Sequence, residues 1–171
     1  VAIGATAGAA ITSGAANTVV GYESGKLLTT GASNVSVGYQ ALRKNTTASY
    51  NTAVGYDSLR ENTTGAQHTA LGDSALLNNT TGNYNIAIGD QALYTQTTGG
   101  TDNVAIGRYS QYYAATATYN VSVGNNSLTN SSSGDFNVAI GHEALEKCTA
   151  AGNVAVGKIA LEQNTSGERN T

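Results

Sequence analysis

The sequence lacks several residue types on which ordinary globular proteins rely. Its 171 residues include no proline, no methionine and no tryptophan, and only one phenylalanine and one cysteine. Charged residues make up 11% of the chain, well below the roughly 25% of a typical domain. These shortages exclude a conventional core of large side chains. Small residues must be buried in a regular way instead, or against copies of the same chain.

The same shortages exclude several functions. A net charge of −3 argues against a nucleic-acid binder, which needs a basic patch. No stretch approaches the roughly 18 apolar residues that predict a membrane-spanning helix, so we expect no membrane insertion. The single thiol, Cys148, forms neither an internal disulfide nor a metal site. We interpret it as a small, half-buried residue.

What the sequence has is a repeat. A pentapeptide of Asn, a β-branched residue, Ala or Ser, an aliphatic residue and Gly recurs along the whole chain, as in NTAVG at 51–55. Successive copies are 17 residues apart, except for one interval of 18 near Gly99 and one of 16 near Gly152. We therefore interpret 1–171 as one repeat domain of about ten 17-residue repeats, and as a piece of a longer polypeptide. The closing glycines are Gly4, Gly21, Gly38, Gly55, Gly72, Gly89, Gly107, Gly124, Gly141 and Gly157.

Each position of the pentapeptide has a physical interpretation. Its alternation and its β-branched residues are typical of a short strand. The second and fourth residues share one face, and because the fourth is always Val, Ile or Leu, we expect this face to be the dry interior. The small third residue predicts close approach of another chain or of the chain's own second segment. The Asn column, in which His68 is a substitution, is expected to stack its amides along the axis. The closing glycine suits a positive φ or tight contact between coils.

A second pattern follows each glycine, with Ala or Ser three residues on and usually Leu four residues on. We favour a short strand or a tight turn here, although the i, i+3 spacing of Tyr39 and Leu42 also suits a helical turn. Together the two patterns predict an all-β fold, a parallel β-solenoid or β-roll. Each repeat is one coil, stacked on the next at roughly 4.8 Å.

The repeat also resembles known families. Repeats of the form NTAVGYxAL…NTTG resemble those in the shafts of bacteriophage tail-fibre proteins, and the NVAIG and GHEAL strings are similar to head repeats of YadA-like trimeric autotransporter adhesins. The resemblance covers essentially all of the chain, and both families imply a homotrimeric fibre. The 17-residue period is longer than the adhesin repeat usually is, which favours the phage fibre. The resemblance implies an extracellular virion tail protein that contacts other tail proteins and supports host attachment.

Residues with catalytic or metal-binding potential are scattered. His68 and His142 have no Cys or paired acid at ligand spacing, so no metal site is predicted. No pair of carboxylates is singled out for glycoside hydrolysis, and the phosphate-binding glycine motifs are absent. We predict neither enzymatic activity nor a cofactor. The function is interpreted as mechanical, a rigid spacer that holds a receptor-binding tip away from a virion.

One aromatic cluster suggests direct binding. Tyr109, Tyr112 and Tyr113 gather where Gln111 interrupts the Leu column. Aromatic rings near amide and carboxylate groups stack on sugars, although tyrosines that merely cover the corners of the coils are the simpler interpretation. These three residues are the candidate surface for a host glycan or protein.

Paired threonines form a second surface pattern. They recur in phase at 46–47, 63–64, 80–81 and 97–98, as in the flat arrays of some ice-binding solenoids. The pattern decays further along the chain, and hydrogen-bonded Ser/Thr turns are the simpler interpretation. The alternatives to a fibre shaft are therefore the head of a bacterial trimeric surface adhesin and an ice- or glycan-binding solenoid.

Overall fold

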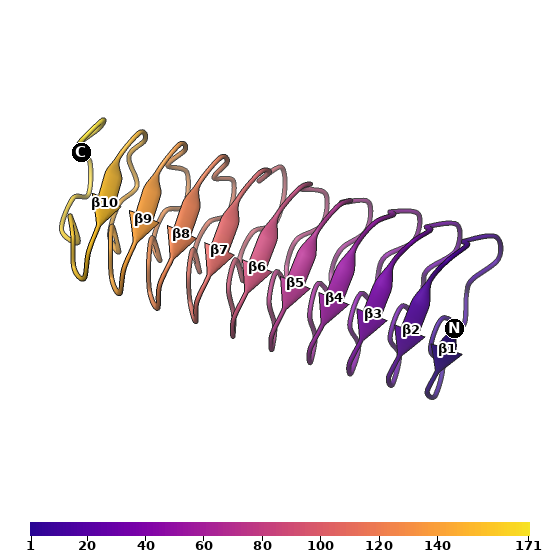
Figure 1. Ribbon diagram of the computed structural model, residues 1–171. Helices are drawn as coiled ribbons and strands as arrows, with labels where there is room; N and C mark the ends of the chain where they lie inside the picture. Colours follow the sequence, from indigo (N-terminus) through magenta and orange to yellow (C-terminus); the bar gives the residue numbers. More distant parts are fainter.

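The structure is a computed structural model that describes residues 1–171, and its chain winds as a β-solenoid with the termini at opposite ends (Figure 1). One short strand per coil contributes to a single ten-stranded parallel sheet, in which each strand pairs only with those of the neighbouring coils. No residue is helical. The predicted fold class is thus confirmed. The strands are β1 (Ala2–Ile3), β2 (Thr18–Val20), β3 (Val35–Val37), β4 (Thr52–Val54), β5 (Thr69–Leu71), β6 (Ile86–Ile88), β7 (Val104–Ile106), β8 (Val121–Val123), β9 (Val138–Ile140) and β10 (Val154–Val156).

The strands pair in the register of the repeat. Ala70 of β5 lies opposite Ala87 of β6, 17 residues on. Ala87 in turn lies opposite Ala105, across the interval of 18, and Ala139 lies opposite Ala155, across the interval of 16. The extra and the missing residue are therefore absorbed in the turns, and the sheet continues without a break.

The prediction of which strand face is buried is wrong. The small third residue of the pentapeptide points inward and is fully buried, as at Ala53, Ala87 and Ser122. The aliphatic fourth residue points outward, and Val54 and Ile140 keep 37% and 40% of their surface exposed. The coil is thin, so the strand contributes a small side chain to an interior whose larger residues come from the opposite wall.

That opposite wall is the segment after each glycine. The Ser58 hydroxyl donates to the Ala70 carbonyl at 3.0 Å, and the Ser24 hydroxyl donates to the Ser36 carbonyl at 2.9 Å. The small-residue columns therefore pack against the chain's own second segment and do not contact another chain. The larger interior residues are the fully buried leucines Leu42, Leu59, Leu76, Leu93, Leu128 and Leu145.

The segment after each glycine is a series of tight turns, which agrees with one of the two conformations we favoured. Gln40 and Leu42 both have φ of +51°, in the left-handed region. Their N–H groups donate along the axis in opposite directions, from Gln40 to Tyr22 O (2.8 Å) and from Leu42 to Ser58 O (3.0 Å). A left-handed leucine costs about 1–2 kcal/mol, which the burial of its side chain, about 2 kcal/mol, offsets.

Buried asparagines form one ladder along the axis and a second, shorter ladder over three coils. The predicted ladder joins the pentapeptide asparagines, where Asn51 N donates to Asn34 Oδ1 at 2.9 Å. A second ladder was not predicted and lies in the turns, where Asn62 Nδ2 donates to Asn45 Oδ1 at 2.9 Å. In both columns the amides bond to a neighbouring coil and to a turn carbonyl, as from Asn51 Nδ2 to Gly65 O at 3.1 Å and from Asn62 Nδ2 to Gly65 O at 2.8 Å. The turn column is interrupted further along the chain, where the buried Gln96 amide and the Ser131 hydroxyl have no partner. Cys148 occupies this second column and is fully buried rather than half-buried, and burial raises the pKa of its thiol.

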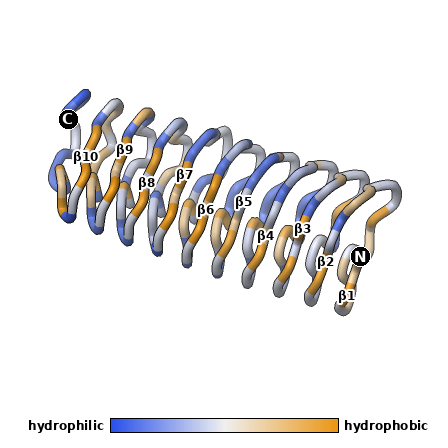
Figure 2. The backbone as a smooth tube through the Cα atoms, viewed as in Figure 1, coloured by the Kyte–Doolittle hydropathy of each residue, from blue (hydrophilic) through white to orange (hydrophobic).

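The outward strand residues form a long apolar surface. Figure 2 shows hydrophobic residues recurring at the strands of every coil. We call this surface the outer strand face and define it as the second and fourth residues of the ten pentapeptides. Its most exposed members within the sheet interior are Val35, Val54, Ile86 and Ile140, each 37–40% exposed. A row of exposed aliphatic residues of this length is typical of an interaction surface.

Candidate functional site

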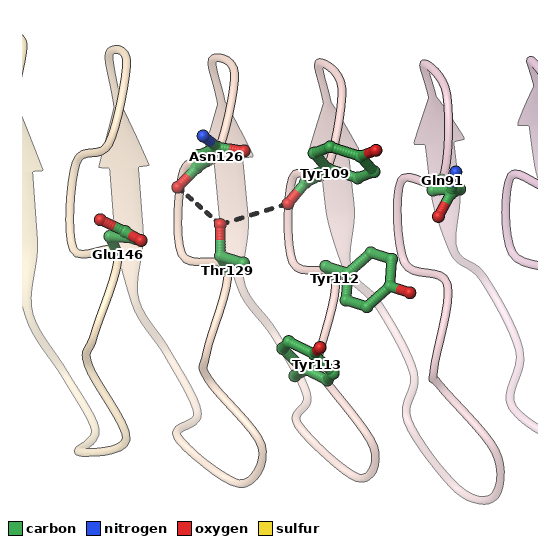
Figure 3. A pocket seen from close by; sticks show the side chains of 7 residues that line it. All are labelled: Gln91, Tyr109, Tyr112, Tyr113, Asn126, Thr129 and Glu146. Carbon is green, nitrogen blue, oxygen red and sulfur yellow. Dashed lines mark hydrogen bonds between the residues drawn. The ribbon is translucent and has the colours of Figure 1, made fainter.

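The surface has one hollow, and it lies at the predicted aromatic cluster (Figure 3). Its volume is about 280 Å³. The lining side chains come from the post-glycine segments of four consecutive coils, across the coil from the strands. We call this hollow the tyrosine pocket, and its lining residues are Gln91, Tyr109, Tyr112, Tyr113, Asn126, Thr129 and Glu146.

The three tyrosines predicted from the sequence form the aromatic wall of the pocket. Tyr112 is at its centre, with the ring of Tyr109 edge-on at 5.5 Å and the ring of Tyr113 edge-on at 4.5 Å. The far side of Tyr112 stacks on Tyr94 at 5.0 Å. Burial raises the pKa of Tyr112, whereas Tyr113 keeps 52% of its surface exposed. The wall is thus held rigid by ring contacts while the Tyr113 ring stays available.

On the polar side of the pocket, some side chains have hydrogen-bond partners within the chain and others have none. The Thr129 hydroxyl donates to Asn126 O at 2.7 Å, and Gln91 Nε2 donates to Asp90 Oδ1 at 3.1 Å. The side-chain amide of Asn126 and the carboxylate of Glu146 have no hydrogen-bond partner within the chain. These two groups, together with the Gln91 carbonyl oxygen, can therefore bond to a ligand.

The hollow arises because the residue types at two positions of the repeat change along the chain. The pocket residues other than Tyr113, which is the sixth residue after its glycine, occupy the second and fifth positions after the glycine. Nearer the N-terminus these two positions carry ion pairs. There Glu23 contacts Lys26 and Arg43, and Asp57 contacts Arg60. Hydrogen bonds from Lys26 and then Arg43 lower the pKa of Glu23 from 4.5 to about 2.

In the pocket coils the second and fifth positions after the glycine hold mainly tyrosine, amide and threonine side chains in place of the ion pairs. Thr129 is short and leaves space between the larger residues Tyr112 and Glu146 of the adjacent coils. Sequence reasoning found the tyrosines but missed Gln91, Asn126, Thr129 and Glu146. Comparing the second and fifth positions of neighbouring repeats is the signal that identifies them.

A buried polar side chain lies in the same coil as the aromatic wall. Gln111 occupies the position held by Leu93 and Leu128 in the adjacent coils and is fully buried. Its Nε2 donates to Val104 O at 3.0 Å and to Ser122 Oγ at 2.9 Å. Its Oε1 has no partner, and a buried acceptor in that state is destabilising.

Replacing Gln111 with leucine is expected to raise the free energy of unfolding by about 1–2 kcal/mol, because the change removes an unpaired buried acceptor and continues the apolar column. The midpoint of urea unfolding measures the effect. Leu93→Gln makes the reverse change one coil away and is expected to lower the midpoint. A lower midpoint for Gln111→Leu would mean that the bonds of its amide outweigh the unpaired oxygen.

The two histidines lie far from the pocket. His68 is buried in the Asn ladder, at the position where the sequence placed it. Its Nε2 lies 2.7 Å from Gly82 O, and its Nδ1 accepts a hydrogen bond from Asn85 N at 3.2 Å. His142 is exposed. No group of three or more His, Cys, Asp or Glu side chains is placed to hold a metal ion.

The paired threonines take part in the contacts between coils. In the first three pairs the first hydroxyl donates to the backbone of the next coil, as from Thr46 to Thr63 O at 3.5 Å and from Thr63 to Thr80 O at 2.9 Å. In the first three pairs only the second residue, such as Thr64, is exposed, whereas Thr97 and Thr98 are both exposed. The first hydroxyl in three of the four pairs is thus bonded within the fold and is not available to a flat surface array.

Two findings concern the chain as a whole. The structure holds no helix with the length and hydropathy needed to cross a bilayer. No protein-family model, no curated protein and no solved structure matches the chain.

Proposed function

We propose that this chain is a segment of the shaft of a phage tail fibre or spike, a homotrimeric, extracellular spacer on the virion that supports host attachment. The proposal draws on the resemblance of the repeats and on the form of the solenoid. Each coil contacts only its neighbours, so every added repeat lengthens the shaft by roughly 4.8 Å without changing its cross-section. The role requires stiffness and length and no chemistry.

Stiffness follows from the number of ladders that join the coils. Strand pairing, the post-glycine turns and the pentapeptide asparagine column bond one coil to the next along the chain, and the turn asparagines add bonds between the coils of Asn45, Asn62 and Asn79. These ladders lie on different sides of the coil, so bending in any direction stretches at least one of them. A chain with a single ladder would bend easily in one plane, whereas this solenoid resists bending in every direction.

The observation that carries the proposal is the outer strand face. It runs along all ten coils, and its aliphatic residues repeat with the spacing of the coils. A partner that covers it along its whole length must have the same spacing, and a second copy of this chain meets that requirement. In a homotrimer the three outer strand faces meet at the common axis, and the post-glycine segments face solvent.

Molar mass in solution tests the assembly. We expect light scattering to give about three times the 17.3 kDa of the chain, and small-angle scattering to give an elongated particle. Val54→Lys combined with Ile86→Lys is expected to yield the mass of one chain, because burying six ammonium groups at the axis costs far more than the apolar contact gains. A monomeric unmodified chain would contradict the trimer.

A matched control separates assembly from folding. Thr47→Lys combined with Thr64→Lys places the same charges in exposed turns of two coils, and this variant is expected to keep the trimer mass. Circular dichroism then checks that both double variants retain β structure. Flanking sequence tests the biological setting, since a tail-attachment segment and a chaperone domain fit the phage fibre and a coiled-coil stalk fits the surface adhesin.

A further inference from the structure

We infer that the tyrosine pocket binds a neutral carbohydrate, with one pyranose ring of a glycan seated against its aromatic wall. This site goes beyond the spacer function and does not depend on it. The pocket lies on the post-glycine segments, and the surface proposed for assembly is the outer strand face across the coil (Figures 1 and 3). The pocket therefore stays open whether the chain is monomeric or trimeric.

The first argument comes from the aromatic wall. A pyranose has one face of C–H groups, which packs on the electron-rich face of an aromatic ring, and hydroxyls around its rim. The exposed ring of Tyr113 offers such a face, and its edge-on contact with Tyr112 fixes its direction. Tyr109 is edge-on to Tyr112 as well, so the wall presents rings in two orientations. The wall is preorganised, which limits the entropy lost on binding.

The second argument comes from the unpaired polar groups. The amide of Asn126 and the carboxylate of Glu146 both reach the hollow without an intramolecular partner. An amide donates and accepts, and a carboxylate accepts in two directions. Vicinal hydroxyls of a sugar match that mixture, since each can donate one hydrogen bond and accept others. A purely apolar ligand would leave these groups desolvated and unbonded.

Charge decides against acidic ligands. No cationic side chain lines the hollow, and Glu146 gives it a negative charge. The adjacent cation, Arg108, is turned onto the Tyr109 ring at 4.4 Å and contacts Asp90 at 3.3 Å. A phosphate or a sialic acid would meet repulsion with nothing to compensate it. The pocket thus favours a neutral ring over an anionic one.

Size agrees with one sugar ring at a time. The hollow of about 280 Å³ is near the lower end of ligand pockets, which begin at roughly 300 Å³. Its lining extends over three coil spacings, roughly 14 Å, so neighbouring rings of a chain also have surface to contact. A dissociation constant on the order of 1 mM is expected for a ring of about 12 non-hydrogen atoms at ordinary ligand efficiency.

The test is a titration of the 171-residue chain with defined trisaccharides, followed by NMR of the sugar protons. The neutral probes are maltotriose, cellotriose, mannotriose and chitotriose, and the acidic probe is sialyllactose. At least one neutral probe is expected to bind, with saturation transfer to its C–H protons, and sialyllactose is expected to bind at least tenfold more weakly. Absence of binding by all four neutral probes at concentrations up to about ten times the expected constant overturns the inference.

Variants place the binding in the pocket. Tyr113→Ala is expected to weaken the neutral probe about tenfold through loss of the stacking surface. Tyr84→Ala is the matched control, because Tyr84 is similarly exposed at 53% but lies outside the pocket. Thr129→Tyr keeps every proposed contact but fills the hollow, and it is expected to abolish binding. If Tyr84→Ala weakens sugar binding as much as Tyr113→Ala does, or if Thr129→Tyr binds the sugar fully, the assignment of binding to the tyrosine pocket is wrong.

One further variant distinguishes a sugar from a cationic ligand. Glu146→Gln removes the charge but keeps an acceptor and adds a donor, so binding of a neutral sugar is expected to change less than fivefold and to stay insensitive to salt. A cationic ligand would lose its only countercharge in the pocket. If the unmodified chain binds an oligolysine peptide more tightly than any neutral trisaccharide, and Glu146→Gln abolishes that binding, the carbohydrate assignment is wrong.

Discussion

Replacing Gly55 with alanine is expected to lower the free energy of unfolding by about 3 kcal/mol or more, since a forced overpacking of about 1–3 kcal/mol adds to a left-handed strain of about 1–2 kcal/mol. Gly55 has φ of +141°, where side chains other than glycine are strained. An added Cβ would lie 2.2 Å from Gly72 O and 2.6 Å from Gly72 C of the next coil. Because these are backbone atoms, no side chain can move aside to make room.

Gly99→Ala is the matched control for this prediction. Gly99 also has a positive φ, +76°, but a Cβ there would meet no atom within 4 Å. Only the backbone strain remains, so the expected loss is about 1–2 kcal/mol. Chemical denaturation of both variants measures the difference. Equal losses would mean that the approach between coils relaxes at little cost and that the closing glycines are required for φ alone.

The location of the damage is a second readout of Gly55→Ala. Stability in a solenoid is a sum over neighbouring coils, so the clash is expected to open the coils of Gly55 and Gly72 while the ends stay folded. Amide hydrogen exchange should then be fastest in β4 and β5 and unchanged in β9. Uniform acceleration along the chain would instead indicate that the solenoid unfolds as one cooperative unit.

The repeat was sufficient to predict the architecture because backbone requirements recur in every coil. A glycine at one phase, an Asn column at another and an alternating strand leave few folds available. The irregular intervals at Gly99 and Gly152 lie in turns, since a strand would lose its register if a residue were added or lost. These features depend on the period, which single substitutions such as His68 do not obscure.

The buried face could not be predicted from the period, because alternation defines two faces without saying which is inside. Hydrophobicity favoured the aliphatic residues such as Val54, yet the interior is only one small side chain deep on the strand side and takes Ala53. The scarcity of large residues was the better guide. Similarly, the tyrosines of the pocket were visible as a local cluster, whereas Asn126 and Glu146 join them only through the stacking of coils.

Acidification is expected to destabilise the solenoid through His68. Desolvation lowers the pKa of this buried imidazole from 6.5 to about 4, against the opposing effect of its hydrogen bond to Gly82 O. The unfolded chain therefore binds a proton between pH 6.5 and 4 that the folded chain does not. Stability from this group is complete above about pH 6.5 and falls as the pH drops, by about 3 kcal/mol at pH 4.

The hydrogen-bond geometry explains why the His68 imidazole stays neutral in the folded state. Nε2 lies 2.7 Å from Gly82 O and so carries the hydrogen, which leaves Nδ1 as the acceptor for the Asn85 N–H at 3.2 Å. Protonation of Nδ1 would break this bond and bury a charge with no counterion in the ladder. The neighbouring repeats avoid the difficulty, because Asn51 and Asn85 supply the same acceptor without titrating.

His68→Asn is therefore the decisive variant. It restores the side chain found at this position in the other repeats, and the unfolding midpoint of the variant is expected to exceed that of the unmodified chain by a margin that grows from pH 7.5 to pH 4.5. Subtracting the two urea curves at each pH removes the contribution of the carboxylates, which both proteins share. His142→Asn, which changes an exposed histidine, is expected to run parallel to the unmodified chain. A margin that stays constant over this range would show that His68 is accommodated in its charged form, and the ladder would then have to open or admit water at that coil.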